Sequence, residues 1–459
     1  MYKYNQKVFN KILNIILIFA IIISTLGFFR DLSNTVKYGG VDLRNRVVGT
    51  RLLNKGFDPY FYKWTPGEDE KFLDPSDDYK LPFTKLTVPP SILILHKPFI
   101  NLPYFTQRII WFCLQWGAFL GSCLLLIKNS DRNENSGLNI KAFWIIALTF
   151  LSAHSFWKLH VYVGQMYVYY VFLISLAYFI LKGKIKFKEF IAGALIGLTI
   201  NLRPPIIVLI LPMIIFKKFK LMGATLFGFC LSSLAFFVLA GQKAWVSYFS
   251  AMSAIAKIKA DVGASISYTN KLQNFVIPKV VEGMDFEYQG LVPSENTSMQ
   301  QVLKSILGFM VSGNILIFIC GVILLIYSIA AFSKYHSKIY RNNWDVLFLV
   351  GTLMILIGDF WIPAPRYPYN DIQFLIPLFL VIKNINLYSY KTLVYIIIII
   401  LGLSISASMF VWLPKEIALG QFILLGTLIL MSLTNNLLFT KNLDSDDKNQ
   451  LQDLNNNIT

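Results

Sequence analysis

The hydrophobic positions of this chain form long apolar runs separated by polar connections. The runs are continuously apolar and lack the alternation of barrel strands. About 20 apolar residues cross a bilayer as an α-helix, and we count about twelve runs, some shorter than that length. They lie near residues 9–29, 106–127, 142–157, 161–181, 187–202, 206–216, 221–240, 306–332, 344–362, 372–382, 392–412 and 417–439. The pattern predicts an all-α, polytopic membrane protein.

Two long polar segments, residues 30–105 and 241–303, interrupt the apolar runs. We expect residues 1–440 to form a single transmembrane domain in which these two segments are large loops carrying short helices. Residues 441–459 are rich in Asn and Asp with little apolar content, which predicts a disordered polar tail. We find no internal repeat, and this weighs against transporter folds built from duplicated halves.

The composition agrees with lipid as the solvent. Of the 459 residues, 55% are hydrophobic and only 15% are charged, whereas soluble proteins average about 25% charged residues. The net charge of +17 does not indicate a nucleic-acid partner, because the basic residues concentrate in short connections between apolar runs. Cytoplasmic loops of membrane proteins have this property. The basic connections are 128–141, 182–188, 217–220, 334–341 and 383–391.

These basic connections predict the topology. If the N-terminus is cytoplasmic, all of them fall on the cytoplasmic side, and both long loops fall on the opposite side. Both termini are then cytoplasmic. The basic stretch 1–11 leads into an apolar run that ends without a small-residue cleavage site, so we expect an uncleaved anchor.

No residue pattern in the sequence indicates a metal site or a bound cofactor. The four cysteines lie in apolar runs without zinc-type spacing, which favours buried thiols (Cys113, Cys123, Cys230 and Cys320). No His, Asp or Glu cluster has metal-ligand spacing, and no glycine-rich phosphate loop is present. We therefore expect neither a required metal nor a cofactor.

The start of the first long loop carries the best candidate for chemistry, Asp42. It lies just outside the first apolar run and begins a short helix that carries Arg44, Arg51 and Lys55, an arrangement suited to an anionic lipid. Asp42 could alternatively be the helix N-cap, with Gly56 ending the helix. The two roles are compatible, because a capping carboxylate keeps free lone pairs. The basic residues could equally contact lipid headgroups.

Further polar candidates lie at the predicted outer ends of other apolar runs. Arg203 and Arg366 each adjoin prolines; a guanidinium there suits bidentate phosphate binding, but it could also snorkel to the interface. Asp359 is a functional candidate because it is an intramembrane carboxylate, or it pairs with an arginine. His160, in an expected short outer turn before Gln165, either contacts substrate or is a solvated turn histidine.

Other carboxylates of the first loop have simpler explanations. Asp58 precedes Pro59, which favours turn initiation. Residues 68–70 and 77–78 are acidic and are expected to be solvated. Asp31 lies close to the first apolar run.

The segment Asp42-Leu43 followed by Gly56-Phe57-Asp58-Pro59-Tyr60 resembles the first external loop of glycosyltransferase family 87, in the GT-C superfamily. The resemblance covers roughly residues 30–220, with a weaker echo at Arg366-Tyr367. Two departures, Met166 after Gln165 and Arg203 where lysine is commoner, leave the sugar open. The other agreeing segments are Thr87–Ser91, Pro98, Leu102–Tyr104, Gly164–Gln165, Ala192–Leu198 and Arg203–Pro205.

This resemblance implies a GT-C-like fold and inverting transfer of a hexose, mannose in most of the family, from a polyprenyl-phosphate-sugar. The acceptor would be a hydroxyl of a glycolipid or glycan at the extracytoplasmic face, in the assembly of a cell-envelope glycan. The family's base matches Asp42. We assign Arg203, Arg366 and Arg44 to the donor phosphate. Contacts with the substrates are assigned to His160, Gln165, Tyr60 and Asp359.

Two other functions remain open: a transporter or flippase of a lipid-linked sugar, and a non-catalytic scaffold in glycan assembly. A transporter predicts buried charges along a path through the membrane, whereas here the ionisable residues collect at the outer ends. The frequent Lys, Asn and Ile residues are typical of AT-rich bacterial genomes, so the expected location is the bacterial inner (plasma) membrane.

Overall fold

The computed structural model describes residues 2–37, 40–74, 76–77, 81–128, 136–262, 296–337, 343–385, 387, 390–407, 414–434 and 437. Within these ranges the chain is helical and contains no β-strand, which confirms the all-α class. The predicted disordered tail and most of the second long loop lie outside the described residues.

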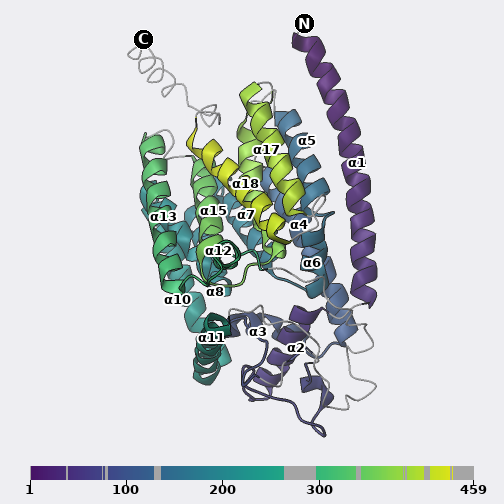
Figure 1. The fold of residues 1–459 in the computed structure, drawn as a ribbon, viewed down its shortest axis with the longest axis vertical. Helices are drawn as coiled ribbons and strands as arrows, with labels where there is room; N and C mark the ends of the chain where they lie inside the picture. Colours follow the sequence, from purple (N-terminus) through teal and green to yellow (C-terminus); the bar gives the residue numbers. More distant parts are fainter. Residues whose placement is uncertain are drawn as a thin grey trace.

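The helices form a tall bundle with a smaller cap at one end (Figure 1). The cap consists of α2 (Val41–Asn54), α3 (Pro90–His96) and their connections, together with α11 (Gln242–Val262). We call this end of the molecule the cap end. The bundle contains α1 (Tyr2–Lys37), α4 (Tyr104–Lys128), α5 (Ser136–Ile146), α6 (Ser155–Val163), α7 (Tyr167–Lys182), α8 (Lys188–Leu202), α9 (Ile210–Ile215), α10 (Phe219–Ala240), α13 (Gly313–Tyr335), α15 (Trp344–Trp361), α16 (Leu375–Asn384), α17 (Tyr390–Ser406) and α18 (Pro414–Leu433).

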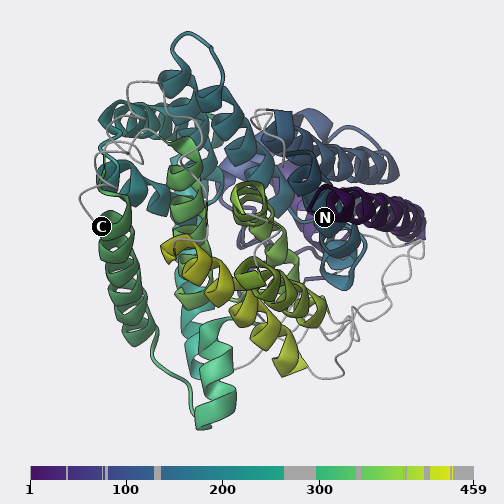
Figure 2. The same ribbon diagram turned by 90° about the horizontal axis from the view of Figure 1, so that it is seen from above.

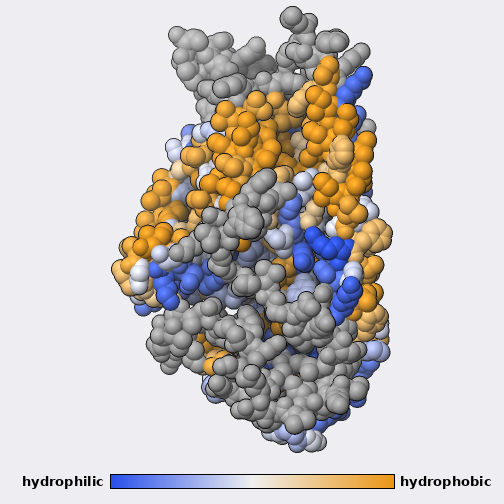
Figure 3. All heavy atoms as spheres, turned by 45° about the vertical axis from the view of Figure 1, so that its right-hand side comes forward, coloured by the Kyte–Doolittle hydropathy of each residue, from blue (hydrophilic) through white to orange (hydrophobic). Residues whose placement is uncertain are grey.

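The outside of the bundle is apolar. Helix α1 lies at its periphery when the molecule is seen from above (Figure 2), and the side chains of Phe19 and Leu26 are 60% and 65% exposed. Hydrophobic residues cover the upper bundle in the view of Figure 3, and polar surface begins below them. An exposed apolar belt over the long helices is expected where lipid replaces water.

The count of about twelve transmembrane helices is not confirmed. Among the described residues, five helices are long and apolar enough to cross a membrane, or six if one bent pair counts as a span. Four further apolar helices are shorter than 18 residues. Only one of them, Pro204–Ile215, corresponds to a predicted run that was too short to cross a bilayer of about 30 Å unaided; the other three correspond to the longer predicted runs 161–181, 392–412 and 417–439.

The largest departure from the predicted runs lies between residues 142 and 181. Helix α5 continues into a π-helical turn, Ala147–Leu151, and the chain then bends by 62° before α6. Ser152 stabilises the bend through two hydrogen bonds. Its hydroxyl donates to Leu148 O at 2.9 Å, and it is also hydrogen-bonded to the Ser24 hydroxyl at 2.8 Å. The expected outer turn at His160 was therefore wrong, because His160 lies inside α6.

Close helix packing fixes the position of Arg203, which follows α8. Gly197 faces α10 so closely that a Cβ atom there would lie 2.4 Å from Thr225 O. Gly228 of α10 similarly meets Ala194 at 2.6 Å. Small residues bring membrane helices into direct backbone contact. This contact fixes the position of the end of α8 and hence that of Arg203.

The cap is built on α2, and Gly40, not Asp42, is its N-cap residue. Asp42 lies in the first turn, where the helix dipole favours a negative charge. Gly56 adopts a positive φ of 79° just after the helix, as predicted for its end. Asp58 accepts a hydrogen bond from Tyr60 N at 2.9 Å, which confirms its role as a turn former.

A buried ion cluster lies at the opposite end of the bundle from the cap. The Asp345 carboxylate accepts hydrogen bonds from Tyr178 at 2.8 Å, Lys182 at 3.0 Å and Lys383 at 2.7 Å. Asp345 and Asp359 lie near the two ends of α15, about 21 Å apart along the helix.

Candidate active site

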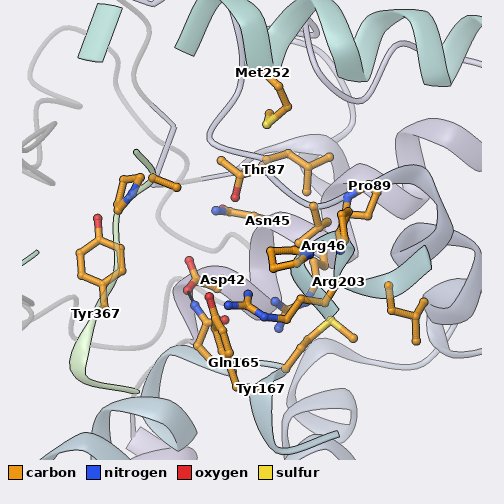
Figure 4. Close-up of a pocket in the computed structure, with 18 of the residues that line it drawn as sticks. Asp42, Asn45, Arg46, Thr87, Pro89, Gln165, Tyr167, Arg203, Met252 and Tyr367 are labelled. Atoms are coloured by element: carbon orange, nitrogen blue, oxygen red, sulfur yellow. Dashed lines mark hydrogen bonds between the residues drawn. The ribbon is translucent and has the colours of Figure 1, made fainter. Parts of the chain in front are cut away.

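A pocket of about 410 Å³ lies between the cap and the bundle. Asp42, Arg46, Gln165 and Arg203 gather on one side of it, with Met252 of α11 on the far side and Tyr367 across the opening (Figure 4). The lining also includes Asn45, Lys85–Pro89, Met166, Tyr167, Tyr170, Leu202, Pro204, Pro205, Tyr248, Ile255, Pro363–Pro365 and Tyr369. The pocket therefore combines a charged wall with an apolar wall.

Asp42 reaches this pocket because α2 packs against the turn between α6 and α7. Gly164, in the left-handed region at φ 77°, ends α6, and a Cβ atom there would lie 2.7 Å from Leu43 Cβ. The next residue, Gln165, donates a hydrogen bond from Nε2 to the Asp42 carboxylate. The Gly164–Gln165 motif thus holds the carboxylate through an amide and leaves it without an ion pair among the described residues.

The environment of Asp42 raises the pKa of its carboxyl group to about 6. Burial is the largest cause, and the like charge of Asp74 adds to it; Arg46, Lys85 and the Gln165 hydrogen bond act in the opposite direction. A base whose pKa lies near the working pH combines ionisation with a useful proton affinity. Asp42 can therefore accept a proton near neutral pH.

Arg46 is a pocket residue that the sequence analysis missed. It lies one helical turn after Asp42, 2% exposed, with its guanidinium 5.2 Å from the centre of the Trp111 ring. Its Nη2 donates to Gly164 O, the carbonyl that also accepts from Trp111 Nε1 at 3.0 Å. The i, i+4 spacing from Asp42 was the available signal, because such residues share a helix face.

Arg203 lines the pocket as expected, but it is already paired. It forms an ion pair with Asp359 and lies 4.2 Å from the centre of the Tyr167 ring. Asp359 also binds Arg366 at 3.1 Å, and Arg366 continues to Asp371 at 2.8 Å. Asp359 and Arg366 therefore belong to a buried network behind the pocket wall and are not among the lining residues.

Three other predicted site residues lie away from the pocket lining. Arg44 is fully buried, donates to Leu73 O at 3.2 Å and lies 4.8 Å from the Tyr104 ring centre. His160 is buried and stacked on Trp157, with its ring nitrogens facing Gln115 and Val168 N. Tyr60 supports the rim: its hydroxyl donates to Val88 O at 2.9 Å.

A row of tyrosines forms the aromatic part of the lining. The Tyr167 ring lies 6.0 Å from Tyr170 and 5.6 Å from Tyr369, whose ring lies 5.2 Å from Tyr367. The sequence analysis missed these residues, because tyrosines at the ends of apolar runs are typical of the membrane interface. No group of three His, Cys, Asp or Glu residues suited to a metal ion occurs in the described part of the chain.

The fold is that of a polytopic helical membrane protein with a charged pocket between its bundle and its cap. A family model for glycosyltransferase family 87 matches residues 87–358, more than half of the 459 residues, and the chain belongs to this family. It is thus a membrane glycosyltransferase, which requires a sugar donor and an acceptor. The matched range includes Gln165 and Arg203 and begins after α2. No curated protein is significantly similar to the chain.

Proposed function

We propose that this glycosyltransferase transfers a hexose, specifically mannose, from a polyprenyl-phosphate-sugar to a hydroxyl of a glycolipid or glycan. The transfer inverts the configuration at the anomeric carbon. Asp42 is the general base. The observation that carries the proposal is the carboxylate of Asp42 in the pocket, held by the Gln165 amide, with its pKa raised to about 6.

In the proposed step, the acceptor oxygen attacks the anomeric carbon while its proton moves to Asp42. The bond between the anomeric carbon and the phosphate oxygen breaks, and the lipid departs as a phosphate monoester that carries the additional negative charge. Phosphate needs no protonation to leave, so one carboxylate suffices, unlike the two required for most glycoside hydrolysis. General-base assistance contributes about 10²–10⁴-fold to such a step.

The pocket supplies groups for both substrates. Arg203 is the proposed partner of the donor phosphate from the sequence-derived set, because it lines the pocket, whereas Arg44 and Arg366 do not. Gln165 is proposed to contact the acceptor as well as Asp42. Tyrosine faces next to a few polar groups are a common lining for a bound organic ligand, and they suit the apolar face of a sugar ring.

The proposed location is the extracytoplasmic face of the bacterial inner membrane. Support comes from the charge of the connecting loops: Lys182 and Lys383, which adjoin short basic connections, cluster at the end of the bundle opposite the pocket. Donors on polyprenyl phosphate suit that face, because they need no nucleotide there. The product would belong to a cell-envelope glycan.

The test is product formation by the purified protein. We would incubate it with several polyprenyl-phosphate sugars and a panel of glycan and glycolipid acceptors, and detect products by mass. New glycosidic product that disappears in Asp42→Asn but persists in Asp69→Asn, a loop carboxylate exposed to solvent, supports the proposal. Movement of the lipid-linked sugar across vesicles without a new glycosidic bond supports the flippase alternative instead.

A further inference from the structure

Helix α2 carries three buried arginines, and two of them, Arg44 and Arg46, have different surroundings. Both have side-chain nitrogens without a hydrogen-bond partner among the described residues: Nε and Nη1 of Arg44, and Nε of Arg46. Arg44 faces the cap interior, between Leu73 O and the Tyr104 ring. Arg46 lines the pocket instead. Only Arg46 can therefore contact a bound substrate.

The positive charge of Arg46 lacks a direct counter-ion. Within the described residues, its one hydrogen bond is donated to a neutral carbonyl, Gly164 O. No carboxylate of these residues forms an ion pair with Arg46. Burial lowers the pKa of Arg46, while the nearby charge of Asp42 opposes this. Burying a cation without a counter-ion costs free energy. An anion bound in the pocket would pair with Arg46 and offset this cost.

Arg203, the other pocket arginine, differs in this respect. Asp359 forms an ion pair with it. The same carboxylate also accepts hydrogen bonds from Asn370 and Gln373, both at 3.2 Å, which holds it in place beside Arg203. The charge of Arg203 is therefore largely compensated before any ligand binds, and the anion preference of the pocket rests more on Arg46.

We propose that Arg46 forms the main anion subsite of the pocket and binds the phosphate of the polyprenyl lipid, both in the donor and in the departing product. This proposal rests on the proposed function. A guanidinium suits phosphate because its planar fork can form two parallel hydrogen bonds. The Trp111 ring centre lies 5.2 Å from the Arg46 guanidinium carbon, and this cation–π contact stabilises the charge of the side chain.

The proximity of Arg46 to Asp42 gives this subsite a role in the step itself. Residues four apart on a helix lie about 5–6 Å from one another. During transfer Asp42 takes the acceptor proton and loses its negative charge, while the phosphate gains one. Arg46 then faces two negative charges throughout: before transfer one is on Asp42 and one on the donor phosphodiester, and after transfer both are on the departing phosphate monoester.

The test is a binding measurement in the Asp42→Asn background, where Arg46 no longer has Asp42 as a charged neighbour. The probes are undecaprenyl phosphate and undecaprenol, titrated into the purified full-length protein in nanodiscs. With Arg46 present, we expect the phosphate to bind at least about 10-fold more tightly than the alcohol. Adding Arg46→Gln should weaken phosphate binding by about 10–100-fold and leave undecaprenol binding unchanged.

Arg44→Gln in the same background is the matched control, because it removes an equally buried guanidinium from the same helix; phosphate preference should persist. If Arg46→Gln does not fold, Arg46→Lys replaces it. This variant keeps the charge but loses the fork, and we expect a smaller loss of affinity. Unchanged phosphate affinity in the Arg46 variant, or equal losses in both variants, overturns the subsite and leaves the proposed function standing. If phosphate and alcohol bind equally with Arg46 intact, the lipid-phosphate donor itself is wrong.

Discussion

The two ends of the bundle each place an aspartate among cations, and the two aspartates are held differently. Asp345 has ion pairs from two lysines and a hydrogen bond from Tyr178, so each of its oxygens has a strong partner. Asp42 has one amide partner, Gln165, and Arg46, the cation that most lowers its pKa, forms no ion pair with it among the described residues. The Asp345 carboxylate is fully paired, whereas the Asp42 carboxylate lines the pocket with a single hydrogen-bond partner.

In the proposed mechanism this difference separates a structural carboxylate, Asp345, from a reactive one, Asp42. A buried carboxylate whose oxygens all accept hydrogen bonds or ion pairs is stabilised in its ionised form, so its proton affinity is low. One that is desolvated and incompletely paired has a raised pKa, and such groups concentrate at functional sites. Both residues are aspartates in the first turn of a helix, and their hydrogen-bond and ion-pair partners distinguish them.

The largest expected effect comes from Asp42→Asn. Loss of the proposed base should reduce turnover by about 10²–10⁴-fold. The melting temperature should stay the same or rise, because the amide removes the cost of a desolvated charge. Turnover by mass detection and thermal unfolding in detergent measure the two quantities. A variant that unfolds with its loss of activity would assign Asp42 a structural role.

The complementary change, Asp345→Asn, should lower stability and spare chemistry. It leaves Lys182 and Lys383 buried without their counter-ion, and breaking a buried pair in this way costs about 3–5 kcal/mol. We expect poor yield and a lower melting temperature, with near-normal turnover per folded molecule. Loss of turnover in a folded Asp345→Asn protein would contradict the contrast between the two ends.

A smaller effect is expected from the helix contact that positions Arg203. Gly197→Leu forces a side chain against the α10 backbone, and overpacking of this kind costs about 1–3 kcal/mol or more. Gly223→Leu is the matched control, because a Cβ atom at Gly223 meets nothing within 4 Å. Thermal unfolding should separate the two variants, and equal melting temperatures would refute the close contact.

The smallest expected effects are shifts in pH dependence. Because Asp42 must be ionised to act as the proposed base, kcat/KM should rise with pH through about 6 and level off above it. Asp74→Asn removes a like charge and should move this rise to lower pH. Gln165→Leu removes a hydrogen bond to the ionised form and should move it to higher pH. Shifts in the same direction for both variants would contradict the assignment.

Much of the fold and part of the site could be predicted from the sequence. Continuous apolar runs indicated helices in lipid, and most run boundaries match the helices; the runs 187–202 and 344–362 correspond to α8 and α15. The apolar pattern missed the break at Gly164, because the residues on both sides of it are apolar. Asp42, Gln165 and Arg203 were named as candidates and lie together in the pocket.

The sequence by itself determined the class of protein, because the period and length of apolar segments reflect the solvent around them. It also limited the candidate base to a few carboxylates of one loop. Only the tertiary structure decided which arginine of α2 faces the pocket and that His160 is buried inside a helix. Those outcomes depend on helix phase and on contacts between distant segments, such as Gly164 with Leu43, which no local pattern encodes.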